Sequence, residues 1–264
     1  MNNQFYEDLG IELADIPAGD FWMGSNMAHS SEGPMREKSV DAFRMMKHQV
    51  TVSQYLAAVE EGACCELLWR APYSVYHYQK KKYEFEENDE HFIKLGAALV
   101  SSNHPIVGIS WDDARAFASW LTVKSGLKFR LPTETEWEYA ARAGVANFFS
   151  TGRYITSDQA NFDARETLHG SPVGEYRGTT TAVGSFTPNP WGLYDMHGNV
   201  FEWVYDCYWD SYTDKDGSSA DYYERVIRGG CWHSPPYQVR SAYREKAYRT
   251  FQRNNIGFRL VQDL

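Results

Sequence analysis

Two carboxylates lie close together in an aromatic-rich stretch, residues 191–203, which reads WGLYDMHGNVFEW. Asp195 and Glu202 are seven positions apart, and the turn pair Gly198-Asn199 stands between them. A tight bend there would bring the carboxylates and several backbone carbonyls together. Because hard oxygen ligands suit calcium better than zinc or iron, the residues indicate a calcium site. The alternative, equally compatible with composition, is a solvated loop whose acids only cap turns.

The four cysteines have no metal-ligand spacing. Cys64 and Cys65 are adjacent in an apolar segment, where buried free thiols are expected. Cys207 and Cys231 belong to neighbouring strand-like regions, so a contact between them is an alternative to two unpaired buried thiols. The eight histidines are scattered and are expected to be surface or core residues.

The composition limits the classes of function. A net charge of −9 argues against a general nucleic-acid binder and against an anionic membrane surface. The N-terminus lacks the basic and apolar regions of a secretory signal, and no stretch approaches the roughly 18 apolar residues that span a bilayer. These features predict a cytoplasmic protein whose partner is neither nucleic acid nor membrane. The 16% of aromatic residues indicates a loop-rich fold with large rings in its core.

The regular elements that position these residues are expected mainly in the first half of the chain. Residues 11–23 predict two short strands, and Ser53 is a plausible N-cap of a helix. Ser110, with acids in the following turn, predicts a second helix. Thr133 and Glu136 form a capping box that begins a third helix.

From residue 145 to the end, turn signals recur and no helix is expected. Four runs there predict strands: 183–186, 201–205, 224–228 and 257–261. No linker divides the chain, so we expect one domain over residues 1–264. Its core would run from about 11 to 262, with a surface insertion at about 67–100.

Several long motifs together resemble one known family. They are IPAGDFWMG from residue 16, PIVGISW from 105, FRLPTETEWEYAAR from 129, GLYDMHGNVFEW from 192, RGGCW from 228 and NIGFR from 255. The chain resembles the formylglycine-generating, sulfatase-modifying superfamily, which also contains ergothioneine-type sulfoxide synthases and pyoverdine-maturation proteins. The resemblance covers residues 11 to 262. It implies an α+β, C-type-lectin-like fold with two main helices, short twisted strands and high loop content.

The resemblance also implies structural calcium. One family site falls on Asp195, Glu202 and the carbonyls of Gly198 and Val200, which agrees with the oxygen cluster inferred from the residues. A second family site falls on four further residues: Asn161, the carbonyl of Phe162, Glu175 and the carbonyl of Arg177. The second match is less close, because the family often has Asp where Glu175 stands.

The family's oxidase chemistry requires two cysteines that hold copper(I) after the Gly-Gly turn, since that ion prefers soft thiolates. Here Ser234 occupies the first cysteine position, and the segment is too short to supply the second. Cys231 stands where the family has Ser. We therefore expect no copper at a two-cysteine site and no formylglycine formation by that mechanism.

The other enzyme branches also lack an essential feature. The sulfoxide synthases bind iron through three histidines, placed mainly in an additional N-terminal domain, and nothing here matches their pattern. The pyoverdine-maturation branch works in the periplasm, and this chain has no export signal. Each branch whose chemistry the resemblance names is therefore disfavoured.

The segment 231–253 carries the side chains typical of a binding surface, because tyrosine gives large contact area at low entropic cost. The candidate ligand-binding residues are His233, Ser234, Tyr237, Gln238, Tyr243 and Tyr248. We expect an accessory protein that binds an unidentified peptide, protein or small molecule.

Other interpretations of this segment remain open. One is a metal- or oxygen-dependent oxidoreductase acting through Cys231, His233, Ser234 and Tyr237. Another is a target of a diversity-generating retroelement, which resembles this segment in layout. The bland alternative is that these residues only pack the last strands. A further interpretation, which concerns another part of the chain, is a structural subunit of a larger assembly that docks through the acidic run Glu84 to Glu90 and the Tyr/Lys-rich stretch Tyr73 to Tyr83.

Overall fold

The computed structural model describes residues 3–65, 73–77, 82–86, 95–99, 101–168, 170–209 and 223–264. The helices and strands are α1 (Asn3–Asp8), β1 (Leu13–Ile16), β2 (Gly19–Met23), η1 (Ser30–Glu32), β3 (Arg36–Val40), β4 (Phe43–Met46), α2 (Val52–Glu60), β5 (Tyr73–His77), β6 (Lys82–Glu86), η3 (Gly96–Leu99), α4 (Trp111–Ser125), β7 (Phe129–Arg130), α5 (Glu134–Arg142), β8 (Phe201–Cys207), β9 (Glu224–Arg228), η4 (Pro236–Val239), β10 (Arg244–Tyr248), β11 (Ile256–Gly257) and β12 (Val261–Asp263). Short strands and long loops dominate, as the sequence predicted.

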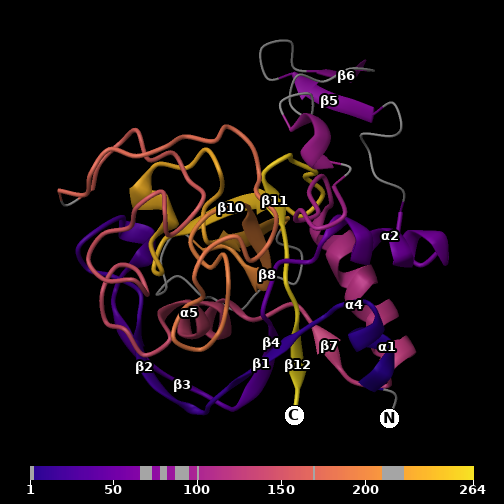
Figure 1. Cartoon of the computed structure of the whole chain (residues 1–264), viewed down its shortest axis with the longest axis horizontal. Coiled ribbons are helices and arrows are strands. Elements are labelled where there is room, and N and C mark those ends of the chain that lie inside the picture. Colours follow the sequence, from indigo (N-terminus) through magenta and orange to yellow (C-terminus); the bar gives the residue numbers. More distant parts are fainter. Residues whose placement is uncertain are drawn as a thin grey trace.

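Two four-stranded sheets carry the fold, in the orders β1-β4-β12-β7 and β10-β9-β8-β11. The first sheet joins the two ends of the chain, since β12 pairs antiparallel with β4. The pairs β2-β3 and β5-β6 form separate two-stranded sheets. Figure 1 shows α1, α2 and α4 at one side of the molecule and α5 with β2 and β3 at the other.

Local capping signals explain where the helices begin. Ser110 caps α4 and Thr133 caps α5, each in a reciprocal capping box with the residue three positions on. The N-cap of α2 is Thr51, not the predicted Ser53, because Thr51 completes a capping box with Gln54. That helix therefore begins two residues earlier than the sequence suggested.

Two of the four strand predictions for the second half were right, and a third was right only at its ends, because residues 258–260 lie outside both β11 and β12. Residues 201–205 and 224–228 lie in β8 and β9, and the run 257–261 spans the end of β11 and the start of β12. Residues 183–186 form turns instead of a strand. The backbone there bonds to another loop, since the Val183 amide donates to the Asn103 carbonyl.

Large aromatic rings fill the core. Trp111 and Trp203 are fully buried in the main hydrophobic cluster, where each indole donates to a backbone carbonyl. Trp137 lies in a second cluster, and Trp191 packs edge-on against Tyr139 with ring centroids 4.8 Å apart. The aromatic residues that flank the 191–203 stretch therefore anchor it to the core.

The predicted insertion at 67–100 lies mostly outside the described residues. What is described of it is the hairpin of β5 and β6 and the short turn η3. Among the residues that the structure describes, no helix is both long and apolar enough to cross a membrane.

Candidate functional site

The loop of residues 195–202 bends through residues with left-handed backbone conformations. Asp195, Gly198 and Asn199 have φ of 56°, 106° and 64°. Position 198 requires glycine, because a Cβ there would lie 2.3 Å from the carbonyl oxygen of Asn161. The bend therefore depends on close contact between two loops, and it turns several carbonyl oxygens inward.

Four oxygens of this loop surround the side-chain amide nitrogen of Gln49. Gln49 Nε2 lies 3.0 Å from Glu202 Oε1 and 3.2 Å from the Val200 carbonyl oxygen. The carbonyl oxygens of Asp195 and Gly198 lie 3.4 and 3.5 Å away. Calcium takes six to eight oxygen ligands at roughly 2.3–2.6 Å. With the amide nitrogen among these oxygens, the first predicted ligand set does not fit a calcium ion.

The charge of Glu202 is already balanced. Both carboxylate oxygens accept from Arg259, each at 2.8 Å, and Oε2 also accepts from the Trp137 indole at 2.8 Å. Glu202 and Arg259 are almost completely buried. A bidentate pair with a further donor gives a buried carboxylate the partners that it needs.

Asp195 contributes its backbone carbonyl to the cluster, whereas its carboxylate turns elsewhere. Asp195 Oδ2 accepts from the Gly184 amide at 2.8 Å. Burial raises the pKa of this carboxyl to about 6, although the Gly184 hydrogen bond and the positive charge of Arg259 act in the opposite direction. One oxygen of the Asp195 carboxylate is therefore already occupied by a backbone donor.

In the second predicted set of calcium ligands, one residue, Asn161, has an oxygen that is available to a cation. Asn161 is buried, its Nδ2 donates to the Thr179 carbonyl at 2.9 Å, and its Oδ1 has no hydrogen-bond partner. An unpartnered buried oxygen is a position that a cation would satisfy. Glu175 instead pairs with Arg177 at 3.0 Å, and its side chain is 64% exposed. Calcium at Asn161 and the Phe162 carbonyl stays a prediction.

The residues proposed for redox chemistry lie mostly in the interior. Cys231 and Ser234 are fully buried, with Sγ and Oγ 3.3 Å apart, in a turn that Ser234 closes by accepting from the Cys231 amide. Burial raises the pKa of the Cys231 thiol, which keeps it protonated. Cys207 is free and contacts Arg225. The Cys207–Cys231 pair considered from the sequence does not form.

His233 and Tyr248 are exposed but lie apart from any cavity described here. His233 Nε2 is 2.9 Å from Asn255 Nδ2, and its ring stands edge-on to Trp232. Tyr248 lies at the end of β10 and packs against Phe251.

The other predicted ligand-binding residues share a cavity of about 760 Å³. Tyr237, Gln238 and Tyr243 line it, together with neighbouring residues of the same segment and residues from other loops. The additional lining residues are Met27, Ala28, His29, Ser31, Phe148, Leu168, Tyr208, Arg240, Arg244, Glu245 and Lys246. Met27, Phe148 and Tyr208 could not be inferred from the sequence, because they come from distant loops without a distinguishing motif.

Two arginines that line this cavity form buried ion pairs. Arg240 makes two hydrogen bonds to Glu32, at 2.7 and 2.9 Å, and Arg244 makes two to Glu134, at 2.8 and 3.0 Å. The Tyr243 hydroxyl donates to Glu245 at 2.8 Å, and burial, first among several causes, raises the pKa of this phenol. The cavity thus offers aromatic walls and arginines that are already paired with carboxylates, which suits binding better than proton transfer.

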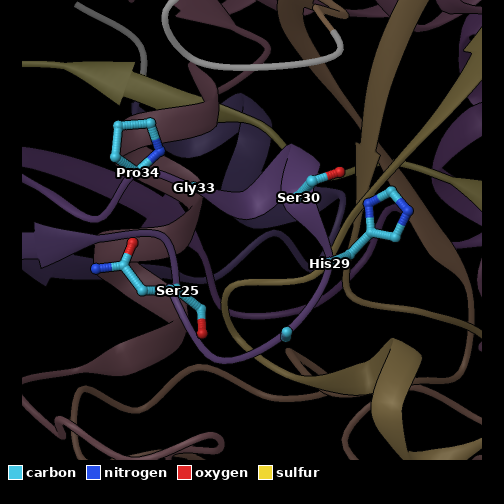
Figure 2. A pocket seen from close by; sticks show the side chains of 7 residues that line it. Ser25, His29, Ser30, Gly33 and Pro34 are labelled. Atoms are coloured by element: carbon cyan, nitrogen blue, oxygen red, sulfur yellow. The ribbon is translucent and has the colours of Figure 1, made fainter.

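A smaller pocket adjoins the cavity. Figure 2 shows it in the loop of residues 25–34, with His29 and Ser30 at one side and Pro34 at the other; its volume is about 310 Å³. Its polar groups shape the loop itself. Asn26 Oδ1 accepts from the Met35 amide at 2.8 Å, and His29 Nδ1 is 2.7 Å from Ser31 Oγ. The two pockets share Ala28 and His29.

The chain is similar to a known family profile and to individual proteins. The sequence profile of the sulfatase-modifying factor enzyme 1-like domain matches residues 10–264. The serine/threonine-protein kinase pkn1 of Chlamydia pneumoniae is 32% identical over 268 aligned residues, which cover 96% of this chain and 38% of that protein. The chain thus spans less than two-fifths of the length of this relative.

Two further proteins align with this chain over most of the length of both chains. The inactive C-alpha-formylglycine-generating enzyme 2 of Bos taurus is 27% identical over 285 residues, or 94% of this chain and 87% of that protein. The structure of PvdO from Pseudomonas aeruginosa superposes with a TM-score of 0.73 at 30% identity, covering 96% of this chain and 94% of that one.

Proposed function

The chain belongs to the sulfatase-modifying factor enzyme 1-like family, with its α+β, C-type-lectin-like fold, and we propose that it is a binding or accessory protein. Its ligand would be a peptide, a protein or a small molecule, held by the segment 231–253. The cytoplasm is the proposed location. The proposal excludes copper-dependent formylglycine formation as the activity of this chain.

The cavity beside Tyr237 is the observation that carries the proposal. Three of the six residues expected to bind a ligand line it, and Tyr237 and Tyr243 stand edge to face, 6.3 Å apart. Tyr237 is 45% exposed, so its ring is accessible from solvent. Tyrosine rings that are rigid and partly exposed favour recognition because they lose little conformational entropy on binding.

The environment of Ser234 supports the absence of oxidase chemistry. A copper(I) site needs two thiolates, and here the first ligand position carries a buried hydroxyl that bonds to the Cys231 amide. The name of the Bos taurus relative describes that protein as inactive, which is compatible with a non-oxidase member of the family. The oxidoreductase alternative has no comparable support, because the Cys231 thiol is buried and protonated.

A pair of tyrosine variants tests the proposed binding site. Aromatic fragments and tyrosine-containing peptides would be screened by ligand-observed NMR, and the affinities of the hits measured for three proteins. We expect Tyr237→Ala to weaken binding at least tenfold, or about 1.4 kcal/mol. Tyr248→Ala is the matched control, since Tyr248 is similarly exposed at 41% but outside the cavity. An equal loss of affinity in both variants, or fragments whose affinity neither substitution changes, would argue against the cavity as the binding site.

A second experiment addresses the oxidase activity. Purified protein would be incubated with copper(I) and a cysteine-containing sulfatase peptide, and the products analysed by mass spectrometry. We expect the peptide thiol to remain intact. An aldehyde product would refute the interpretation of Ser234.

A further inference from the structure

Gln49 connects two distant parts of the chain. It lies between β4 and α2, is fully buried, and reaches the loop of residues 195–202. Its amide nitrogen has four oxygens within 3.5 Å, which is the position at the centre of the predicted calcium ligands. Two orientations of the amide would fill this position: the nitrogen facing the loop oxygens, or the amide oxygen facing a cation.

The hydrogen bonds around Asn199 determine the orientation of Gln49. The backbone amide of Thr181 donates to Asn199 Oδ1 at 2.9 Å, and a backbone N–H can only donate. Asn199 Nδ2 is therefore the end that faces Gln49, where it donates to Oε1 at 3.2 Å. With its oxygen held by this donor, Gln49 must direct its NH₂ group toward the oxygens of the loop.

The charges in the cluster are compatible with a neutral donor. Arg259 supplies one positive charge to Glu202 through two hydrogen bonds, and also donates to the Tyr194 carbonyl at 2.8 Å. Oδ2 of the Asp195 carboxylate accepts from the Gly184 amide. Two N–H donors of Gln49 and the guanidinium of Arg259 thus meet the inward-facing acceptors of this loop.

We infer that the Gln49 amide takes the position of the calcium ion expected at this loop, so that hydrogen bonds and Arg259 brace residues 195–202 without a cation. The brace connects β8, through Glu202, with Trp137 of α5. The same helix supplies Glu134 and Glu138 to the buried arginines Arg244 and Arg228. The segment that lines the cavity is therefore supported by a framework that calcium depletion would leave intact at this position.

Calcium stoichiometry and melting temperature test this inference on the whole chain. Equilibrium dialysis would count calcium ions per molecule in the wild type and in Asn161→Ala, which removes the unpartnered oxygen of the second predicted set. We expect at most one ion per wild-type chain and none in the variant. Two ions in the wild type, or a chelator-dependent loss of melting temperature that persists in Asn161→Ala, would overturn the inference.

The variant Gln49→Glu tests the same inference by creating a calcium site. It places a carboxylate oxygen among the loop oxygens without changing the shape of the side chain, and such a cluster needs a cation. We expect this variant to gain one calcium ion and to melt about 5 to 10 °C higher with calcium at a hundredfold excess over Kd than with chelator. A folded Gln49→Glu protein that binds no additional calcium and whose melting temperature does not depend on calcium would contradict the inference. If the variant does not fold, the wild-type stoichiometry decides.

Discussion

Replacing Arg240 with methionine removes the partner of a carboxylate that has no access to solvent. Glu32 is completely buried, and both of its oxygens accept from the Arg240 guanidinium, at 2.7 and 2.9 Å. Arg240 Nε also donates to the Tyr237 carbonyl at 2.8 Å, which fixes the start of the cavity wall. The variant therefore leaves an unpaired buried charge and frees the backbone at Tyr237.

The expected cost follows from the burial of both partners. Breaking a buried pair by removing one member costs about 3–5 kcal/mol, because the remaining charge keeps its desolvation penalty without compensation. For a chain of 264 residues, a shift of roughly 2–4 °C per kcal/mol corresponds to a fall in melting temperature of about 6–20 °C. Binding of any fragment that contacts Tyr237 should weaken in the same variant.

Urea unfolding followed by tryptophan fluorescence measures this cost. The matched control is the double variant Glu32→Leu with Arg240→Met, which removes both charges and should recover most of the lost stability. The coupling free energy from the complete cycle should amount to several kcal/mol. A single-variant cost below about 1 kcal/mol, or simple additivity in the cycle, would refute the argument that this ion pair supports the cavity.

Three further predictions concern other buried groups. Burial lowers the pKa of His197 to about 4, so between about pH 6.5 and 4 the unfolded chain binds a proton that the native chain does not. The free energy of unfolding should therefore fall by on the order of 3 kcal/mol as pH falls through this window. Urea unfolding measured across this pH range should show a flatter profile for His197→Gln. Because burial raises its pKa, Cys231 should resist iodoacetamide at pH 8 while exposed Cys65 is labelled; tryptic mass spectrometry would show otherwise if Cys231 were accessible. Glu202→Ala strands the buried Arg259 and should cost about 3–5 kcal/mol in urea unfolding, and a near-neutral effect would contradict its role in the brace.

Local signals in the sequence predicted the local parts of the fold. The capping residues Ser110 and Thr133 satisfy helix-end amides within one turn, so the beginnings of α4 and α5 could be inferred without tertiary information. The same rule could not separate Ser53 from Thr51, two hydroxyl residues two positions apart, because only the capping box with Gln54 selects Thr51. The apolar run at 183–186 shows the limit, since a strand needs a partner that sequence does not reveal.

The site was predictable only in outline. The glycine of the bend at 195–202 is visible in the sequence, whereas the side chain that occupies its centre comes from Gln49, about 150 positions away. The same holds for the cavity, whose ion pair joins Arg240 to Glu32 across 208 positions. The sequence could suggest Tyr237 and Tyr243 from residue type, but contacts over such separations depend on the complete packing of the chain.

A crystallographic soak with aromatic fragments shows whether the cavity beside Tyr237 binds ligands, because it locates bound molecules without assuming a reaction. The account predicts fragments in the cavity, in contact with Tyr237 or Tyr243 and beside the paired Arg240. Fragments that bind instead next to an opened Cys231, with the cavity empty, would contradict it.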